Sequence, residues 1–305
     1  MRNKIVLILL FVSNILCSAQ SDSLYFFDYE KDTEWLQKLQ NYKLSAAETK
    51  DVRINIQEVF ELINENSDVI INYNSVISQY IHKYLSYKWL SKIFGLLKFY
   101  QPLFETKLAE YGLPLDLKYL AIVESNLNPQ AGSWAGASGL WQFMPKTGQN
   151  YGLAKNSKIN LFFDPYSSTD AACQYLSFLY KMFGDWNLVL SAYNSGQGTV
   201  LNAIKKAGTK NYWVVRQYLP DETKAYVPSF HAVRFVGKAY SLFFEFLPTL
   251  KYDYSQVGEL TADKTTTFKE FAAENNLNLQ QLYFLNPHIV TEIIPKGVFV
   301  YYLKN

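Results

Sequence analysis

Between residues 100 and 245, segments with a helical pattern alternate with turns that are rich in glycine, serine and asparagine. These turns cover residues 128–139, 155–160 and 194–198. Residues of this kind supply left-handed backbone conformations and exposed backbone donors. The alternation therefore predicts a helical scaffold that carries loops, and loops held on a scaffold are where functional sites tend to be built.

Composition excludes several classes of protein and of site. Apolar residues make up 49% of the 305 residues, which is enough for a sizeable core and excludes a disordered chain. With 2 cysteines and 3 scattered histidines, the chain cannot form a disulfide-rich scaffold or a four-cysteine zinc site, and we expect no metal site. The formal charge of +2 gives no electrostatic footprint for nucleic acid, so we expect no nucleic-acid partner.

The N-terminus has the pattern of a secretory signal peptide, which we assign to residues 1–19. A short basic segment precedes an apolar run over residues 5–12, and small residues follow up to Ala19. The run is too short to predict a membrane span. Cleavage would remove Arg2 and Lys4 and leave as many basic as acidic residues. We therefore expect an exported, periplasmic protein.

The two cysteines leave one alternative open. Lipidation of Cys17 would attach the protein to the outer membrane, but Leu16 stands where a lipidation signal has a small residue. We take the unlipidated form as the main interpretation and leave an association with the outer membrane open. Cys173 lies in a helical pattern with no histidine nearby in sequence, and we interpret it as a buried, inert thiol.

Three regions follow the signal peptide, and together they predict a mainly α fold. Residues 20–100 have the periodicity of amphipathic helices and little functional signal, so we expect a packing or positioning role. Residues 101–247 carry the loops described above. Residues 258–305 predict a strand, two short helices and a closing strand.

The segment 112–125 predicts a helix that ends in a carboxylate. Leu117, Leu120 and Ala121 share one helix face with Glu124. An apolar setting raises the pKa of a carboxyl group, and an acid that stays protonated near neutral pH is what general acid catalysis requires. For Glu124 alone, the alternative is a helix-end residue that is hydrated or paired with a lysine.

Four motifs follow one another in an order and at separations that are typical of one known family. They are Glu124-Ser125, Gly139-Leu140-Trp141-Gln142-Phe143-Met144, Ala192-Tyr193-Asn194 and Glu222-Thr223-Lys224-Ala225-Tyr226-Val227. Over about residues 80–240 the chain resembles the lytic transglycosylases of glycoside hydrolase family 23, whose SLT domain has the goose-type lysozyme-like fold. Within that family it is most similar to the membrane-bound lytic murein transglycosylase D type.

The resemblance implies a role for each motif residue. Glu124 corresponds to the family's sole catalytic acid, and the residues that would bind the substrate are Ser133, Gln142, Met144, Tyr193, Asn194, Glu222 and Tyr226. The alternatives are structural: Gln142 and Asn194 could bond loop backbone, Met144 could belong to the core, and Tyr193 and Tyr226 could be packing residues. We expect Trp141 in the core, and Ser125 either fixes a loop or contacts substrate.

One carboxylate also limits the mechanism. Ordinary glycosidases use two carboxyl groups, and we interpret Asp164 and Asp170 as turn and helix-start residues rather than as a second acid. The resemblance implies cleavage of the β-1,4 bond between N-acetylmuramic acid and N-acetylglucosamine in peptidoglycan, with formation of 1,6-anhydro-N-acetylmuramic acid ends and without a cofactor. The alternatives are a lysozyme-like muramidase of the same fold and a non-catalytic peptidoglycan-binding scaffold. We expect a monomer.

Residues 258–305 weakly resemble the βααβ LysM module, which binds peptidoglycan. The usual opening Gly-Asp-Thr-Leu is absent, and Asp263-Lys264-Thr265-Thr266 stands in its place. The segment is therefore interpreted as a degenerate LysM-like module, and the alternative is a folded cap that packs on the catalytic domain.

Overall fold

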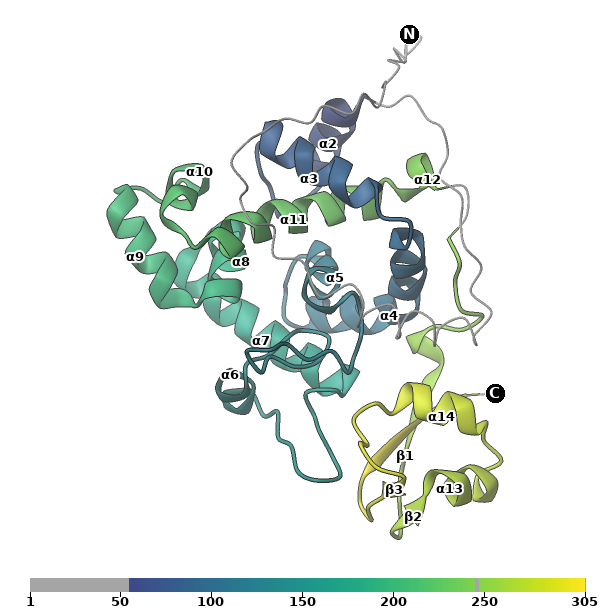
Figure 1. The fold of residues 1–305 in the computed structure, drawn as a ribbon. Coiled ribbons are helices and arrows are strands. Elements are labelled where there is room, and N and C mark those ends of the chain that lie inside the picture. Colours follow the sequence, from purple (N-terminus) through teal and green to yellow (C-terminus); the bar gives the residue numbers. More distant parts are fainter. Residues whose placement is uncertain (1–54, 245–246, 305) are drawn as a thin grey trace. The chain divides into compact units, whose positions relative to one another are not determined.

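The computed structural model describes residues 55–244 and 247–304. The predicted signal peptide, Cys17 and the first part of the N-terminal helical region lie outside the described residues. The described part is mainly α-helical, as predicted, and its strands all follow residue 256 (Figure 1). It forms two compact units: residues up to 95 together with 176–248 make the first unit, and residues 96–175 together with 249–304 make the second.

The first unit is built from helices. They are α2 (Ile56–Glu65), α3 (Ser75–Leu85), the start of α4 (Leu90–Glu110), the end of α7 (Pro165–Phe183), α8 (Trp186–Ser195), α9 (Gln197–Ala207), α10 (Tyr212–Val215), the 3-10 turn η2 (Arg216–Tyr218), α11 (Asp221–Lys238) and α12 (Tyr240–Phe243). The side chains of Asn55, Asn74 and Asp185 accept backbone N–H groups at the starts of α2, α3 and α8. These caps satisfy donors that a helix leaves free at its N-terminus.

Helix α11 is buried along most of its length and packs against α3 and α8. Its Arg234 is fully buried, and the guanidinium donates to the Ser67 hydroxyl at 2.8 Å, to the Val69 carbonyl and to the Asn64 side chain. A buried charge is stable only when it is hydrogen-bonded. These bonds therefore hold the connection between α2 and α3 against α11.

The second unit contains the rest of α4 and the start of α7, and short elements connect them. These are the 3-10 turn η1 (Leu115–Tyr119), α5 (Leu120–Ser125) and α6 (Pro145–Asn150). Trp141 is fully buried here, as predicted. Its indole N–H donates to the Thr169 hydroxyl at 3.0 Å, and its ring meets Phe104 edge-on at 5.2 Å between centroids. A buried indole needs such a partner for its N–H.

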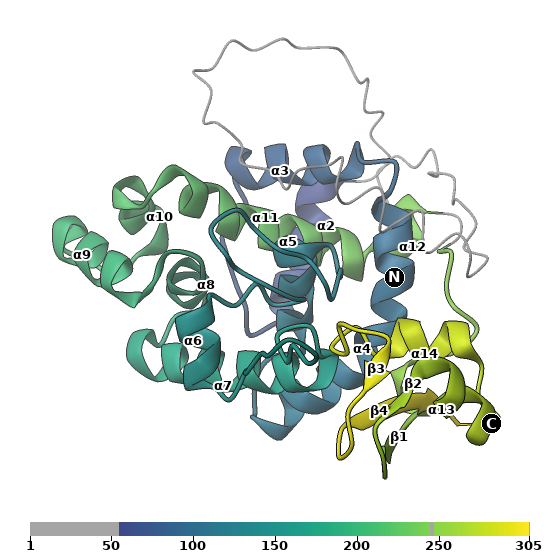
Figure 2. The same cartoon turned by 60° about the horizontal axis from the view of Figure 1, so that its bottom comes forward.

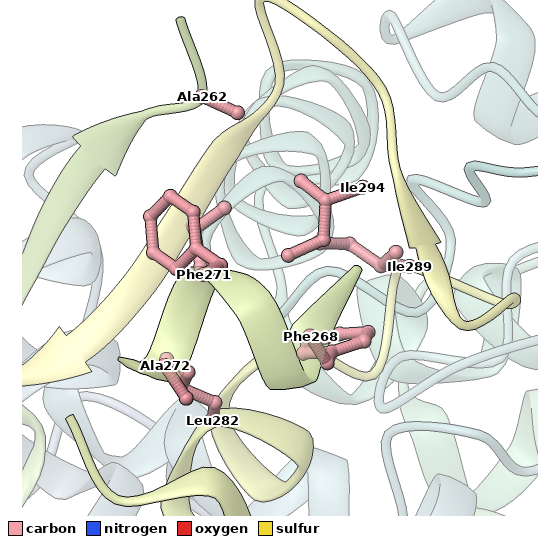
Figure 3. Close-up of a cluster of buried hydrophobic side chains, with 8 residues drawn as sticks. Ala262, Phe268, Phe271, Ala272, Leu282, Ile289 and Ile294 are labelled. Carbon is pink, nitrogen blue, oxygen red and sulfur yellow. The ribbon is translucent and has the colours of Figure 1, made fainter. Parts of the chain in front are cut away.

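The C-terminal segment of this unit has the two predicted helices between strands, with two strands on each side in place of the one predicted. It consists of η3 (Tyr254–Gln256), β1 (Val257–Thr261), β2 (Thr266–Thr267), α13 (Phe268–Glu274), α14 (Leu279–Leu285), β3 (Ile293–Ile294) and β4 (Phe299–Leu303). Strands β1 and β4 pair antiparallel from Val257↔Leu303 to Thr261↔Phe299, and β2 pairs with β3. Figure 2 shows α13 and α14 beside these strands. Phe268, Phe271, Leu282 and Ile294 form the centre of a small core between the helices and strands (Figure 3).

The C-terminal segment packs on the 155–164 loop of the same unit. The backbone N–H of Asn160 donates to the His288 carbonyl at 2.8 Å, and that of Val290 donates to the Lys158 carbonyl at 2.9 Å. Ile159 packs against the core of the C-terminal segment. The segment is thus joined to the region before α7 by main-chain pairing and by apolar contact, which is the behaviour expected of a cap.

Candidate active site

Glu124 lies in the last turn of α5, where the chain leaves the helix. The predicted single helix over 112–125 is wrong in one respect, because the structure has the 3-10 turn η1 followed by the six-residue α5. The chain enters η1 from Pro114 with extended backbone, at φ −56° and ψ 129°. Leu117 and Leu120 are fully buried, as the apolar stripe predicts, whereas Glu124 is half-buried. The carboxylate therefore lies at the end of the buried stripe.

The turn after Glu124 has unusual backbone geometry. Asn126 and Leu127 have φ values of 50° and 63°, which is the left-handed region that glycine normally occupies. Asparagine adopts this conformation readily, whereas for a residue such as leucine it costs about 1–3 kcal/mol and persists only where the surroundings hold it. Leu127 is fully buried, and its N–H donates to the Ala121 carbonyl at 3.3 Å. Burial and hydrogen bonding thus fix the direction in which the chain leaves Glu124.

Ser125 ties this turn to the Gly-Leu-Trp-Gln-Phe-Met motif. It is fully buried, and its hydroxyl lies 2.8 Å from the Leu140 carbonyl and 3.0 Å from the Ala121 carbonyl. At Gly139, φ is +84° and a Cβ would lie 1.9 Å from the Phe162 carbonyl oxygen, so only glycine fits. Ser125 thus fixes the loop, which was one of its two predicted roles.

Gln142 is also part of the loop scaffold. Its side-chain nitrogen lies 2.9 Å from the Gly139 carbonyl and 3.2 Å from the Ala131 carbonyl, and its own φ is 46°. The structural alternative for this residue, bonding to loop backbone, is what the structure shows. Met144 behaves in the opposite way, because 45% of it is exposed. A place in the core is therefore wrong for Met144.

Ser133 and Trp134 lie at the turn between α5 and the Gly-Leu-Trp-Gln-Phe-Met motif. The Ser133 hydroxyl accepts the N–H of Ala137 at 2.9 Å, and the two residues are also paired through the Ser133 N–H and the Ala137 carbonyl. The turn holds Trp134 with 98% of its surface exposed. Sequence reasoning missed this residue, because nothing in the local pattern separates an exposed tryptophan from a core one.

The remaining predicted residues lie in the first unit, at the end of α8 and the start of α11. The Thr223 hydroxyl donates to the Asn194 side-chain oxygen at 2.7 Å, and the Asn194 side-chain nitrogen lies 3.4 Å from the Glu222 carboxylate. Thr223 is fully buried and Glu222 is exposed. We call Asn194, Glu222 and Thr223 the Asn194 cluster. Thr223 orients the amide of Asn194 and leaves its donor side toward the carboxylate.

The two predicted tyrosines lie beside this cluster in sequence but differ in exposure. Tyr193 precedes Asn194 in α8 and is half-buried, whereas Tyr226 lies one turn after Glu222 in α11 and is 7% exposed. The structure thus gathers Tyr193, Asn194, Glu222 and Tyr226 on two helices of the first unit. It gathers Glu124, Ser133, Gln142 and Met144 on the short elements of the second.

Asp164 and Asp170 have structural roles, although only Asp164 starts a helix. Asp164 accepts the backbone N–H groups of Tyr166 and Ser167 at the beginning of α7, as predicted. Asp170 lies one turn further into α7 and pairs with Lys107 at 3.2 Å. The helix-start interpretation of Asp170 is therefore wrong, because the helix begins at Pro165.

Other reactive side chains are held in unreactive states. Cys173 is buried, as predicted, and burial raises the pKa of its thiol to about 12.

Over residues 55–244 and 247–304, the structure has no group of three His, Cys, Asp or Glu side chains that could hold a metal ion. In the same part of the chain, no helix is long and apolar enough to span a membrane.

Comparison with known proteins identifies the central part of the chain. Residues 102–215 match the family model described as Transglycosylase SLT domain. This segment is a transglycosylase SLT domain. It includes six of the predicted site residues, from Glu124 to Asn194, and Glu222 and Tyr226 follow it.

Two curated relatives are similar to the chain over less than half of their own length. Membrane-bound lytic murein transglycosylase D of Escherichia coli (strain K12) is 42% identical over 142 residues, which cover 45% of this chain and 31% of the relative. Membrane-bound lytic murein transglycosylase C of Haemophilus influenzae (strain PittGG) is 29% identical over 147 residues, which cover 43% and 41%.

Two solved structures of lytic transglycosylases match parts of the chain. The 70 kDa soluble lytic transglycosylase SLT70 of Escherichia coli matches 73% of this chain and 45% of its own, with 21% identity and a TM-score of 0.43. Lytic transglycosylase Slt of Pseudomonas aeruginosa matches 50% of this chain and 25% of its own, with 24% identity and a TM-score of 0.40.

Proposed function

We propose that this protein is a peptidoglycan lytic transglycosylase in which Glu124 is both the catalytic acid and the catalytic base. The observation that carries the proposal is the position of Glu124 within the SLT domain, at the end of a buried helix whose exit turn is fixed by Ser125 and Leu127. A general acid must be held within hydrogen-bond reach of the leaving oxygen. A rigid turn behind a half-buried carboxyl group meets that requirement.

The other carboxyl groups of residues 96–175 support a single catalytic acid. Glu105 pairs with Lys118, Glu110 and Asp170 pair with Lys107, and Asp164 caps α7. Asp116 is buried in the first turn of η1. A two-carboxylate glycosidase needs a second acid or nucleophile on the other side of the scissile bond, and these five groups are engaged or buried in the fold.

The proposed reaction uses Glu124 twice. Its carboxyl proton passes to the glycosidic oxygen as the bond to C1 of N-acetylmuramic acid breaks, and the 2-acetamido oxygen of that sugar stabilises the cationic centre. The carboxylate then takes the proton of the C6 hydroxyl, whose oxygen bonds to C1 and closes the 1,6-anhydro ring. Water is not consumed, and Glu124 ends the cycle protonated.

The other site residues would hold the glycan or the catalytic loop. Gln142 positions the loop through its backbone contacts, and the exposed Met144 and Ser133 would contact the sugars. The Asn194 cluster offers a carboxylate acceptor and an amide donor, the groups that bind sugar hydroxyls, with Tyr193 and Tyr226 beside it. These contacts would mainly bind substrate.

The test is the Glu124→Gln variant in a lysis assay on purified peptidoglycan sacculi. The amide keeps the size of the side chain but cannot supply the proton, so we expect loss of glycan cleavage with an unchanged circular dichroism spectrum. Glu110→Gln is the matched control, because it changes an exposed carboxylate of the same unit. Near-normal lysis by Glu124→Gln would refute the assignment.

Product masses distinguish the two candidate reactions. A transglycosylase leaves 1,6-anhydro ends that are about 18 Da lighter than the reducing ends left by a hydrolase. Anhydro products are expected here, whereas reducing ends would identify a muramidase of the same fold. Binding to sacculi without any released product would identify a non-catalytic scaffold.

The same proposal extends to the location of the protein and to the role of its C-terminal segment. The curated relatives are named as membrane-bound enzymes, which supports a place at the cell envelope for this chain. We propose export to the periplasm, action as a monomer, and a C-terminal LysM-like segment that serves first as a cap on the 155–164 loop. Cell fractionation and gel filtration test the first two points.

A further inference from the structure

The C-terminal segment carries a cavity that is separate from the proposed active-site residues. Its volume is about 400 Å³, and its lining comes from residues 251–256, from the turn and helix at 276–282, and from residues 302–304. All three parts belong to the second unit. The volume lies in the range of small-ligand sites, about 300–1,000 Å³.

The floor and walls of this cavity are fixed by the fold. Leu282 belongs to the segment's core (Figure 3), and Leu277 and Tyr302 pack against that core. Two walls are joined where the Lys304 N–H donates to the Gln256 carbonyl at 2.9 Å. A cavity whose walls are already in place loses little conformational entropy when a ligand binds.

The lining contains four residues with amide side chains. They are Gln256, Asn276, Asn278 and Gln281, and Tyr252 is also part of the lining. An amide group both donates and accepts hydrogen bonds, which suits a ligand with peptide groups.

The charge of the lining is entirely positive. Lys251 and Lys304 line the cavity, and no aspartate or glutamate does. Both lysines are exposed, and neither makes an ion pair within residues 55–244 and 247–304. Lys264 in the same segment is different, because it pairs with Glu274 at 2.8 Å. Two exposed ammonium groups in a lining that also contains amides favour a ligand with carboxylates.

We propose that this cavity binds a short peptide with free carboxylates, of the kind that the stem peptides of peptidoglycan present. The amide side chains would bond the peptide groups, and Lys251 and Lys304 would pair with the carboxylates. The source of the peptide rests on the proposed function, whereas the peptide chemistry rests on the cavity itself. A neutral glycan has no carboxylate with which the two lysines could pair.

Fluorescence anisotropy with a labelled synthetic tetrapeptide tests this assignment. The probe is L-Ala–γ-D-Glu–L-Lys–D-Ala with free carboxylates, and the protein is the full chain. Lys251→Glu with Lys304→Glu should weaken binding at least about tenfold. The control, Lys269→Glu with Lys296→Glu, makes the same charge change in the same segment outside the lining and should change the affinity less than about twofold.

One further variant acts on the polar lining without changing charge. Asn276 has a φ of 52°, so Asn276→Gly keeps the backbone conformation while it removes one amide. Its expected loss of affinity is about threefold.

Three outcomes would overturn the proposal. They are an absence of peptide binding by the wild type, equal affinities of the lysine pair and its control, and equal affinity for a probe whose carboxylates are amidated. Loss of chitotetraose binding in place of peptide binding would also overturn it and would make the cavity a glycan site. None of these readings depends on cleavage. If Glu124→Gln kept full lysis while peptide binding depended on the lysines, the proposed function alone would fail.

Discussion

The turn at Glu124 and the Asn194 cluster are built in opposite ways. At Glu124 the backbone is held by buried groups: the Ser125 hydroxyl, the fully buried Leu127 and the left-handed φ at Asn126. In the Asn194 cluster, side chains bond one another across two helix ends, and Glu222 is exposed. The comparison suggests that a group that must aim a proton is placed by rigid backbone, whereas groups that hold sugars can be placed by adaptable side chains.

Neutralising each carboxylate in turn is the strongest test of this comparison. Glu124→Gln should lower kcat about 100- to 10,000-fold, because general acid catalysis contributes a factor of that size. Glu222→Gln should raise KM and lower kcat less than about tenfold, because it removes a binding contact. Steady-state lysis of soluble glycan fragments gives both constants. Equal losses of kcat in the two variants would contradict a catalytic role for one region and a binding role for the other.

The next largest effect is expected when the hydroxyl group that supports each region is removed. Ser125 supports the turn at Glu124, and Thr223 supports the Asn194 cluster. Ser125→Ala leaves the Leu140 carbonyl without its partner in a buried place, so the free energy of unfolding should fall by about 1–3 kcal/mol. Thr223→Val removes the hydrogen bond to Asn194, which lies next to an exposed residue. The free energy of unfolding should fall by about 1 kcal/mol.

Kinetics would separate positioning from plain destabilisation in these two variants. Below the unfolding temperature, Ser125→Ala should lower kcat more than it raises KM, and Thr223→Val should do the reverse. Urea titrations give the free energies, and both variants should keep the wild-type circular dichroism spectrum. A Ser125→Ala protein with normal kcat would show that the turn does not depend on this bond.

Much of the arrangement could be predicted from local pattern. Helical periodicity gives the mainly α fold, and motif order places Glu124 at a helix end. The two helices between strands in the C-terminal segment follow from residues 258–305, whereas the short strands β2 and β3 were not predicted. The break between η1 and α5 could not be predicted, because Leu117 and Leu120 keep the same periodicity on both sides of it.

What could not be predicted depends on contacts between distant residues. Ile159 packs against the C-terminal core, and Gln142 bonds the carbonyl of Ala131, but neither contact leaves a local signal. Trp134 is fully exposed although tryptophan usually indicates core. Two of the three unit boundaries fall inside the continuous helices α4 and α7, where periodicity has no break to detect.

A smaller effect is expected on how the free energy of unfolding changes with pH, and it should differ between the two units. His231 in α11 is fully buried, which lowers the pKa of its imidazole well below 6.5, and its Nε2 donates to Asn187 at 2.7 Å. The unfolded chain binds a proton below a pKa of about 6.5 and the folded chain does not. The free energy of unfolding should therefore fall as the pH drops below about 6.5, by about 1.4 kcal/mol per pH unit for this residue.

Variants of the two histidines show which unit causes the change of the free energy of unfolding with pH. Burial also lowers the pKa of His288 in the second unit, but the Asp164 carboxylate opposes the shift, so its contribution should be the smaller one. Urea titrations between pH 7.5 and 5.5 should show a flatter profile for His231→Gln than for His288→Gln. A wild-type free energy that does not change with pH would contradict the neutral state of His231.

The smallest effect should be at the left-handed turn itself. In Asn126→Gly the backbone keeps its φ of 50° without a Cβ penalty, so the free energy of unfolding should change by less than about 1 kcal/mol. Asn126→Val should instead lose about 1–3 kcal/mol, because a β-branched residue resists that conformation. At a temperature where both variants are folded, a loss of kcat in Asn126→Val alone would show that the turn positions Glu124. If both variants keep the wild-type kcat, rigid backbone is not what aims the carboxyl group.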